Sequence, residues 1–105
     1  TVYRAGTSST IDWRNVTEQA DTVYCLELVE HMEYPAELLQ GVAGLAKRRL
    51  VIGTPRHGLI PFRLHRGEHL WDFTEDELRD LLSPYGKVGE FIPAGVECCV
   101  VAVDK

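Results

Sequence analysis

The chain has 105 residues, enough for one domain with a hydrophobic core of its own. Its composition is that of an ordinary globular protein, with 45% apolar and 26% charged residues. A net charge of -5 argues against a general nucleic-acid binder or a membrane-surface protein, and no apolar run approaches the ~18 residues that span a bilayer.

The three cysteines, Cys25, Cys98 and Cys99, all lie within apolar runs. They lack the C-x-x-C spacing that is typical of zinc and redox sites. We interpret them as buried free thiols, and this interpretation favours a reducing, cytoplasmic location.

The first half of the chain predicts strands separated by a helix. Residues 1–5 predict a short strand, and the unbroken apolar run within 22–28 predicts a strand that is buried on both faces. Pro35 can open a helix because its missing N–H costs nothing at the first helical position. Apolar residues at helical spacing extend this helix over 35–47, and the short apolar run 50–53 predicts the next strand. Three basic residues suit the negative end of the helix dipole: Lys47, Arg48 and Arg49.

The second half predicts a helix followed by a hairpin. The sequence Thr74-Glu-Asp-Glu77 matches a capping box and predicts a helix over 74–82. Two apolar segments, 87–92 and 96–103, are separated by a turn sequence and predict an antiparallel hairpin. The whole order predicts an α/β fold with a parallel sheet that has an antiparallel strand at its far end.

Several stretches, in this order, resemble the carboxyl-terminal part of a class I S-adenosylmethionine-dependent methyltransferase: Asp21–His31, Leu50–Pro55, His69 and Phe73–Leu82. The resemblance implies a partial Rossmann-like methyltransferase sheet. Residues 1–105 would then form a single domain that lacks the amino-terminal, cofactor-binding half of the family. In that family the first strand carries the glycine-rich loop that holds the cofactor. The chain alone is therefore expected to bind S-adenosylmethionine weakly or not at all.

The same resemblance makes the strand at 22–28 the fourth strand of the family, which lies beside the first. Without that first strand it would present an open apolar edge, which is an aggregation hazard. We expect this edge to be covered by residues 1–5, by a second copy of the chain in a homodimer, or by a partner that brings the missing half.

Polar side chains follow the strand at 22–28, at the end where open α/β sheets bind ligands. Methyl transfer needs aligned partners and, for a poor nucleophile, the removal of a proton. His31 is the candidate general base because the ordinary pKa of histidine lies near neutrality, and Glu27 or Glu30 would orient it. Alternatively, Glu30 caps the following helix and His31 is only a hydrogen-bonded neighbour of the sheet edge.

The candidate cofactor contacts are Glu27 and Leu28, at the end of this strand, and Trp13. The Trp13 indole could flank the cofactor purine. The more common role for such a side chain is packing, at the surface or in the core.

Glu27, Glu30, His31 and His69 also form a possible metal set. The resemblance includes small-RNA 2′-O-methyltransferases, which hold a divalent ion with a similar E-x-x-E-H sequence and a later histidine. Oxygen and imidazole ligands suit Mg, Mn or Zn ions. Many small-molecule methyltransferases of this superfamily share the pattern and use no metal.

The segment Arg56–His69 is long, irregular and cationic, with three arginines and three histidines against one glutamate. Long irregular loops in compact domains are commonly functional lids, and a cationic lid suits a carboxylate or phosphate-ester acceptor. The alternative is a solvated loop whose arginines pair with the acidic surface. Trp71 and Phe73 are expected to anchor the following helix in the core. The candidate substrate contacts are Arg56, His57, Arg63, His65 and His69.

The sequence thus supports three hypotheses. The leading one is the acceptor-side portion of a methyltransferase that acts on a small molecule and is inactive as an isolated chain. The second is a non-enzymatic interaction or assembly module derived from a truncated methyltransferase fold. The third is a fragment of a metal-dependent RNA 2′-O-methyltransferase.

Overall fold

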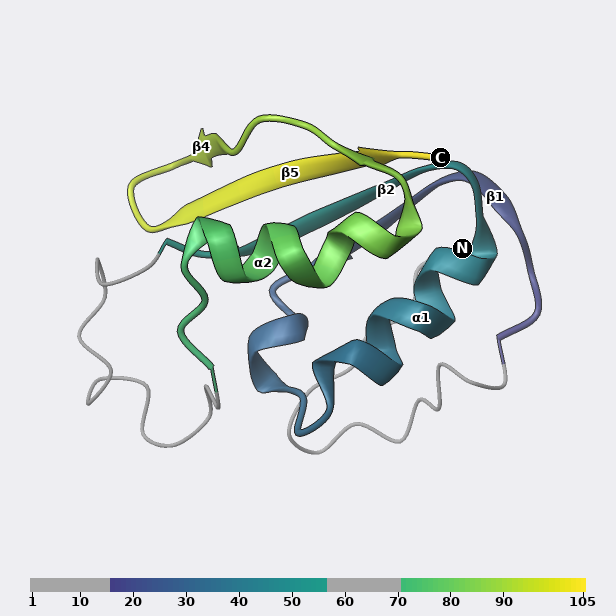
Figure 1. Ribbon diagram of the computed structural model, residues 1–105, viewed down its shortest axis with the longest axis horizontal. Helices are drawn as coiled ribbons and strands as arrows, with labels where there is room; N and C mark the ends of the chain where they lie inside the picture. Colours follow the sequence, from purple (N-terminus) through teal and green to yellow (C-terminus); the bar gives the residue numbers. More distant parts are fainter. Residues whose placement is uncertain (1–15, 57–70) are drawn as a thin grey trace.

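The computed structural model describes residues 16–56 and 71–105 (Figure 1). These residues form two α-helices, five strands and two short 3-10 turns, which carry the label η. In chain order they are β1 (Ala20–Leu26), η2 (Val29–His31), α1 (Pro35–Leu45), β2 (Ala46–Pro55), α2 (Glu75–Leu82), η4 (Ser83–Tyr85), β3 (Lys87–Val88), β4 (Ile92–Ala94) and β5 (Cys98–Asp104).

The strands form one mixed sheet in the order β1-β2-β5-β3, and β4 also pairs with β5. β1 and β2 are parallel and are joined through α1, whereas β5 runs antiparallel to β2, β3 and β4. The predicted α/β fold class is confirmed, with a parallel pair at one side of the sheet and antiparallel strands at the other.

The junction between α1 and β2 corrects the predicted bounds. α1 begins at Pro35 as predicted but ends at Leu45, and the chain continues directly into β2 at Ala46. The predicted strand 50–53 therefore extends over ten residues, and the predicted strand 22–28 ends at Leu26. β2 is longer because it is paired on both sides, with β1 from Ala46 onward and with β5 as far as Pro55.

The three basic residues expected at the end of α1 lie in β2 and are exposed. Lys105 takes their expected place at the helix end. Its ammonium group donates to the carbonyl oxygens of Ala43 and Ala46 at 2.7 and 2.8 Å. The negative end of the helix is thus neutralised by a residue about sixty positions away in the sequence.

Helix α2 follows the prediction closely. Thr74 caps α2 with the expected capping box: its hydroxyl accepts from the Glu77 N–H at 3.1 Å, and its own N–H donates to the Glu77 carboxylate at 2.9 Å. The predicted hairpin also forms, but its turn lies at 95–97 and not at 93–95, so β4 extends to Ala94 and β5 begins at Cys98. The first strand of the hairpin is interrupted between β3 and β4. There Arg79 of α2 donates to the carbonyl oxygens of Val88 and Gly89 and lies over the Phe91 ring.

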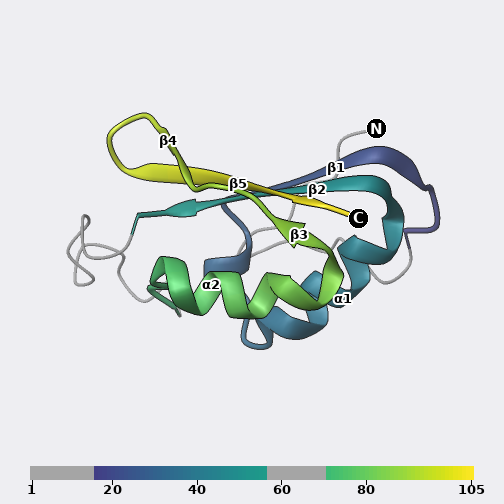
Figure 2. The ribbon, with the colours of Figure 1, turned by 45° about the horizontal axis from the view of Figure 1, so that its top comes forward.

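Helices α1 and α2 cover the same face of the sheet (Figure 2). The buried core between them and the sheet comprises Cys25, Val29, Leu38, Leu39, Val42, Ala43, Ala46, Leu50, Ile52, Phe73, Leu78, Leu82, Val101 and Val103. Phe73 is thus in the core as predicted. Trp71 is not: it is 43% exposed, because its indole hydrogen-bonds to a neighbouring turn instead of entering the core.

Tyr24 and Leu26 of β1 point to the other face and are 67% and 54% exposed. Within the two described ranges, β1 pairs with β2 alone. The predicted strand at 1–5 lies outside the described residues, so cover for this edge stays a prediction. In the part of the chain that the structure describes, no helix has the length and apolar character needed to cross a bilayer.

Candidate functional site

The candidate site begins where β1 ends beside β2. Leu26 is in register with Gly53, and the next residue, Glu27, has a φ of 54°. Its N–H donates to the Gly53 carbonyl oxygen at 2.8 Å, so the strand pairing holds Glu27 in a left-handed conformation. For a residue other than glycine this conformation costs about 1 kcal/mol, and such strain is concentrated at functional sites.

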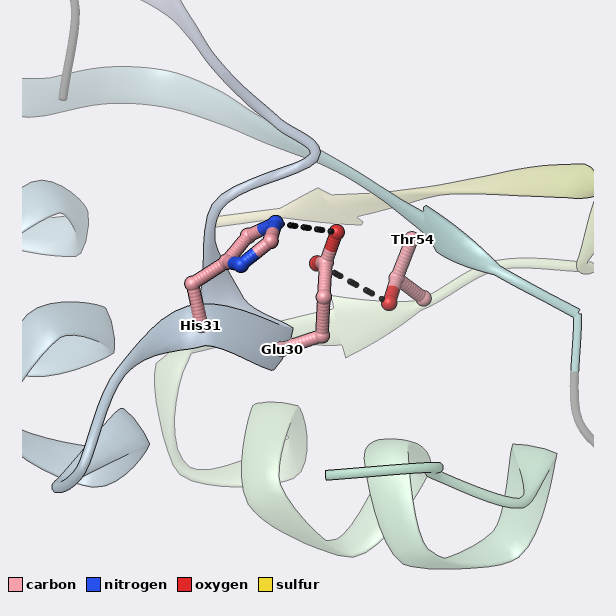
Figure 3. A network of polar contacts seen from close by, with 3 residues as sticks. All are labelled: Glu30, His31 and Thr54. Atoms are coloured by element: carbon pink, nitrogen blue, oxygen red, sulfur yellow. Dashed lines mark hydrogen bonds and ion pairs between the residues drawn. The ribbon is translucent and has the colours of Figure 1, made fainter. Parts of the chain in front are cut away.

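The 3-10 turn η2 then places Glu30 and His31 side by side (Figure 3). The Glu30 side chain is 1% exposed, and its Oε1 accepts a hydrogen bond from the Thr54 hydroxyl at 3.2 Å. The other oxygen, Oε2, lies 3.6 Å from His31 Nε2. It receives no hydrogen bond from the described residues. The His31 side chain is 24% exposed, so the imidazole can reach solvent whereas the carboxyl group behind it cannot.

Burial raises the pKa of Glu30 to about 7, from an ordinary value of 4.5. The carboxyl group of Glu27, which lies close by, raises it further. A backbone hydrogen bond and, to a smaller extent, the Thr54 hydroxyl oppose the shift because they stabilise the charged form. Glu30 therefore exchanges its proton near neutral pH, as acid–base residues in active sites commonly do.

Cys98, at the start of β5, joins this site through Glu27. Its thiol hydrogen-bonds to the Glu27 carboxylate, which is the main reason that the pKa of Cys98 rises to about 12. Burial, assisted by the charge of Glu30, raises the pKa of Cys25 to about 12 as well. All three cysteines are free thiols, as predicted, and Cys25 and Cys99 are buried, whereas Cys98 is half-buried.

Trp71 holds the segment before α2 against the η2 turn. Its indole N–H donates to the Met32 carbonyl oxygen at 2.7 Å, and its backbone N–H donates to the Glu30 carbonyl oxygen at 3.2 Å. Its ring stacks on Phe73 with centroids 5.8 Å apart. The Glu30 backbone is therefore held both by its own η2 turn and by the segment before α2.

The structure brings together the three residues predicted to carry the chemistry: Glu27, Glu30 and His31. The capping alternative for Glu30 is wrong, because the N-cap of α1 is Tyr34 and no side chain caps it. Leu28 is half-buried against the core, and its carbonyl oxygen accepts from the His31 N–H at 3.0 Å.

Arg56 directly follows β2 and is exposed. Its backbone N–H donates to the Glu97 carbonyl oxygen at 2.8 Å. The remaining predicted contacts lie outside the described residues: Trp13, His57, Arg63, His65 and His69.

Sequence reasoning missed Thr54 and Cys98. A polar residue at the end of an otherwise apolar strand could have indicated Thr54. Cys98 carried no such signal, because its approach to Glu27 depends on long-range strand pairing.

Among residues 16–56 and 71–105, no group of three His, Cys, Asp or Glu side chains is arranged to hold a metal ion. The predicted metal set includes His69, which lies outside these ranges. The metal set therefore stays a prediction.

No protein-family profile and no curated protein matches the sequence. Solved structures do match its fold. Magnesium protoporphyrin IX methyltransferase (ChlM) from Synechocystis PCC 6803, with bound SAH, superposes with a TM-score of 0.69 at 17% identity, over 90% of this chain and 49% of ChlM. TnmH gives a TM-score of 0.70 at 18% identity, over 92% of this chain and 34% of TnmH.

A third similar structure belongs to the Pnkp1/Rnl/Hen1 RNA repair complex, with a TM-score of 0.61 at 16% identity, over 90% of this chain and 24% of the matched chain. The chain has part of the class I methyltransferase fold. It spans about half the length of ChlM, which has been crystallised with SAM as well as with SAH.

Proposed function

We propose that the chain is the acceptor-side part of an S-adenosylmethionine-dependent methyltransferase that acts on a small molecule. The observation that carries this proposal is the position of the Glu30–His31 pair, at the carboxyl ends of the parallel strands of a methyltransferase fold. Ligands of open α/β sheets bind at that edge. S-adenosylmethionine would be the cofactor of the complete enzyme, since ChlM holds it in a similar fold.

His31 is the proposed general base and Glu30 its positioning residue. The partly exposed imidazole would take the proton from the acceptor's O–H or N–H group. The acceptor atom then forms a bond to the methyl carbon, and the electrons of the broken carbon–sulfur bond remain on sulfur. The Glu30 carboxyl group, 3.6 Å behind the imidazole, would stabilise the positive charge that His31 gains.

Glu27 and Leu28 are the proposed cofactor contacts, together with Trp13. The support for Glu27 is its exposed, strained position at the end of β1. Arg56 is the proposed anchor of the acceptor's polar end because it is exposed at the end of β2, beside β1. The proposal extends to the acceptor contacts beyond the described residues: His57, Arg63, His65 and His69.

Calorimetric titration of the 105-residue chain with S-adenosylmethionine tests where the cofactor half resides. We expect weak binding or none, because the proposal places the glycine-rich cofactor loop in polypeptide outside these residues. Micromolar affinity would refute that placement.

A second experiment tests the base. The assay uses the complete natural protein, S-adenosylmethionine with a radioactive methyl group and a panel of small acceptors. His31→Gln should lower kcat by about 10²-fold and leave KM for the cofactor unchanged. Glu33→Gln, which changes an exposed residue of the same loop, is the matched control. An unchanged kcat in His31→Gln would remove His31 from the mechanism.

The exposed side chains of β1 favour a second candidate function, an interaction or assembly module. Tyr24 and Leu26 are large apolar groups on a strand that pairs on one side only among the described residues. Analytical ultracentrifugation should then show a homodimer or a tight heteromeric complex. Leu26→Lys should dissociate it, whereas Lys47→Gln should not. A monomer with rapidly exchanging β1 amide hydrogens would exclude this candidate.

The RNA methyltransferase hypothesis is supported only by the E-x-x-E-H sequence and by the fold likeness to the RNA repair complex. Equilibrium dialysis against Mn²⁺ tests it directly. Retention of one ion per chain, lost in His69→Ala, would favour it over the small-molecule proposal.

A further inference from the structure

A small pocket of about 150 Å³ lies between the end of β2, the start of α2 and β5. These segments come together at one end of the sheet (Figure 1). Its walls are mixed: Phe73, Leu78, Phe91 and Cys99 supply apolar surface, and Thr54, Arg56, Thr74 and Glu75 supply polar surface. A cavity of roughly this volume in apolar surroundings holds one benzene molecule. The pocket thus has the size for a single six-membered ring, and its mixed walls suit a ring that carries a polar group.

Two opposite charges also line this pocket, Arg56 and Glu75. Both act on the Cys99 thiol in the wall. Burial is the main cause that raises its pKa, the Glu75 carboxylate raises it further, and the Arg56 guanidinium lowers it. A charged ring would be attracted by one of the two groups and repelled by the other, so neither sign of charge on the ring is favoured. A hydroxyl group suits both, because it can accept from the guanidinium and donate to the carboxylate.

Thr54 connects the pocket to the candidate catalytic residues. It lines the pocket, and its hydroxyl donates to Glu30 Oε1 at 3.2 Å. The carboxyl group of Glu30 in turn lies against His31. A ring in the pocket would therefore lie one side chain away from the Glu30–His31 pair.

We propose that this pocket binds one aromatic ring that carries a neutral hydroxyl group, that is, a simple phenol. Ring binding rests on the pocket itself. The use of the pocket as the acceptor subsite rests in addition on the proposed methyltransferase function.

Titration of the ¹⁵N-labelled chain with phenol, followed by two-dimensional NMR, tests the proposal. We expect saturable shifts at the amides of Phe73, Leu78, Phe91 and Cys99, with half-saturation at about 1 mM for a ligand of this size. Benzoate and benzylammonium, which have the same ring and opposite charges, should each bind at least about fivefold more weakly. Shifts that rise linearly without saturating, or an equal or tighter fit of benzoate, would overturn the proposal.

Two variants make the test specific to the pocket. Cys99→Met adds volume to the wall and should abolish phenol binding. Arg56→Gln keeps the apolar wall and removes the cation, so it should weaken phenol binding about fivefold. Arg48→Gln, an exposed arginine of β2 that does not line the pocket, should leave binding unchanged. If Cys99→Met fails to fold, the Arg56→Gln and Arg48→Gln pair still decides, because equal phenol affinities in that pair would refute the site.

Failure of this inference and failure of the proposed function give different results. Saturable phenol binding without any methyl transfer would support the pocket and refute its use as an acceptor subsite. Methyl transfer to other acceptors without phenol binding would refute the pocket and leave the methyltransferase proposal intact.

Discussion

The two ends of the β1–β2 pair differ in how well their polar groups are satisfied. At the end where β2 begins, the Lys105 ammonium donates to two carbonyl oxygens at the end of α1. Arg49 forms a 2.6 Å ion pair with Asp104 across the β2–β5 ladder. These contacts cap the end of α1 and link β2 to β5, so this end of the molecule serves stability.

At the opposite end, where β1 and β2 finish, two glutamates are in arrangements that cost folding free energy. Glu30 is a buried carboxyl group with one unsatisfied oxygen and a raised pKa. Glu27 has a left-handed backbone, and its carboxylate lies close to the Glu30 carboxyl group. A protein retains such costs mainly where they serve binding or catalysis. The contrast within one pair of strands is the physical argument for the position of the candidate site.

The largest expected effect belongs to the stable end. Gly86 has a φ of 155°, and a Cβ atom at this position would collide with the Asp104 carbonyl oxygen. Gly86→Ala should therefore lower the free energy of unfolding by about 3 kcal/mol, measured by urea denaturation. Gly95→Ala is the matched control: φ is 75° there, but no atom lies within 4 Å of the added Cβ. Its loss should be about 1 kcal/mol. Equal losses in the two variants would show that Gly86 is not held against β5.

Glu30→Gln should have an effect of similar size and opposite sign. Folding raises the pKa of Glu30 from 4.5 to about 7, so the folded state binds the proton more tightly than the unfolded state does. The stability from this protonated group is fully present below pH 4.5 and is lost as the pH rises through 7. A shift of this size corresponds to about 3 kcal/mol. Glutamine mimics the protonated form, so the variant should match the wild type near pH 4.5 and be more stable by up to about 3 kcal/mol at pH 8.

Thermal and urea unfolding between pH 4 and pH 8.5 would measure this difference. Glu33→Gln removes an exposed carboxylate from the same loop and should show no comparable rise. A stability difference for Glu30→Gln that does not change with pH would mean that Glu30 ionises normally, and the contrast between the two ends would lose its main support.

The extent to which sequence predicted these features depends on how local each one is. The capping box of α2 and Pro35 at the start of α1 are short-range features, and the sequence predicted both. Glu30 and His31 are adjacent in sequence, so their proximity needed only the end of β1 to be located. The Thr54 contact to Glu30 spans 24 residues and depends on the parallel register of β1 and β2.

Longer-range features escaped prediction altogether. Lys105 reaches a helix end that is 62 and 59 residues distant, a contact that no local pattern specifies. The exposed position of Trp71 follows from its hydrogen bond to Met32, 39 residues away. The sequence around Lys105 does not indicate the end of α1 as its partner, and the sequence around Trp71 does not indicate Met32.

Thr54→Val should have a smaller, pH-dependent effect. Valine has nearly the same shape but cannot donate to Glu30 Oε1, so the charged form of Glu30 loses its hydrogen bond. The pKa of Glu30 should rise further, and stability at pH 8 should fall by about 1–2 kcal/mol. The loss should be smaller at pH 5, where Glu30 is protonated. Titration of the Glu30 carboxyl group by carbon-13 NMR measures the pKa directly. Thr54→Ser keeps the hydroxyl and should restore the wild-type value; a raised pKa in both variants would instead indicate a packing effect.

Lys105→Met should have the smallest effect, at the stable end. The variant keeps the unbranched aliphatic chain and removes the ammonium group that donates to the Ala43 and Ala46 carbonyl oxygens. These carbonyl groups lie at a helix end, where water can replace part of the lost interaction, so the free energy of unfolding should fall by only about 1 kcal/mol. Lys47→Met, on an exposed position of β2, removes the same charge without a helix-capping contact and should change stability less.

Hydrogen exchange tests whether the two ends are independent. Because the Lys105 bonds are local to the end of α1, exchange should quicken in the last turn of α1 and stay unchanged at Glu30. Faster exchange at both ends of the β1–β2 pair would show that the two ends are energetically coupled, and the separation of stability from function along these strands would not hold.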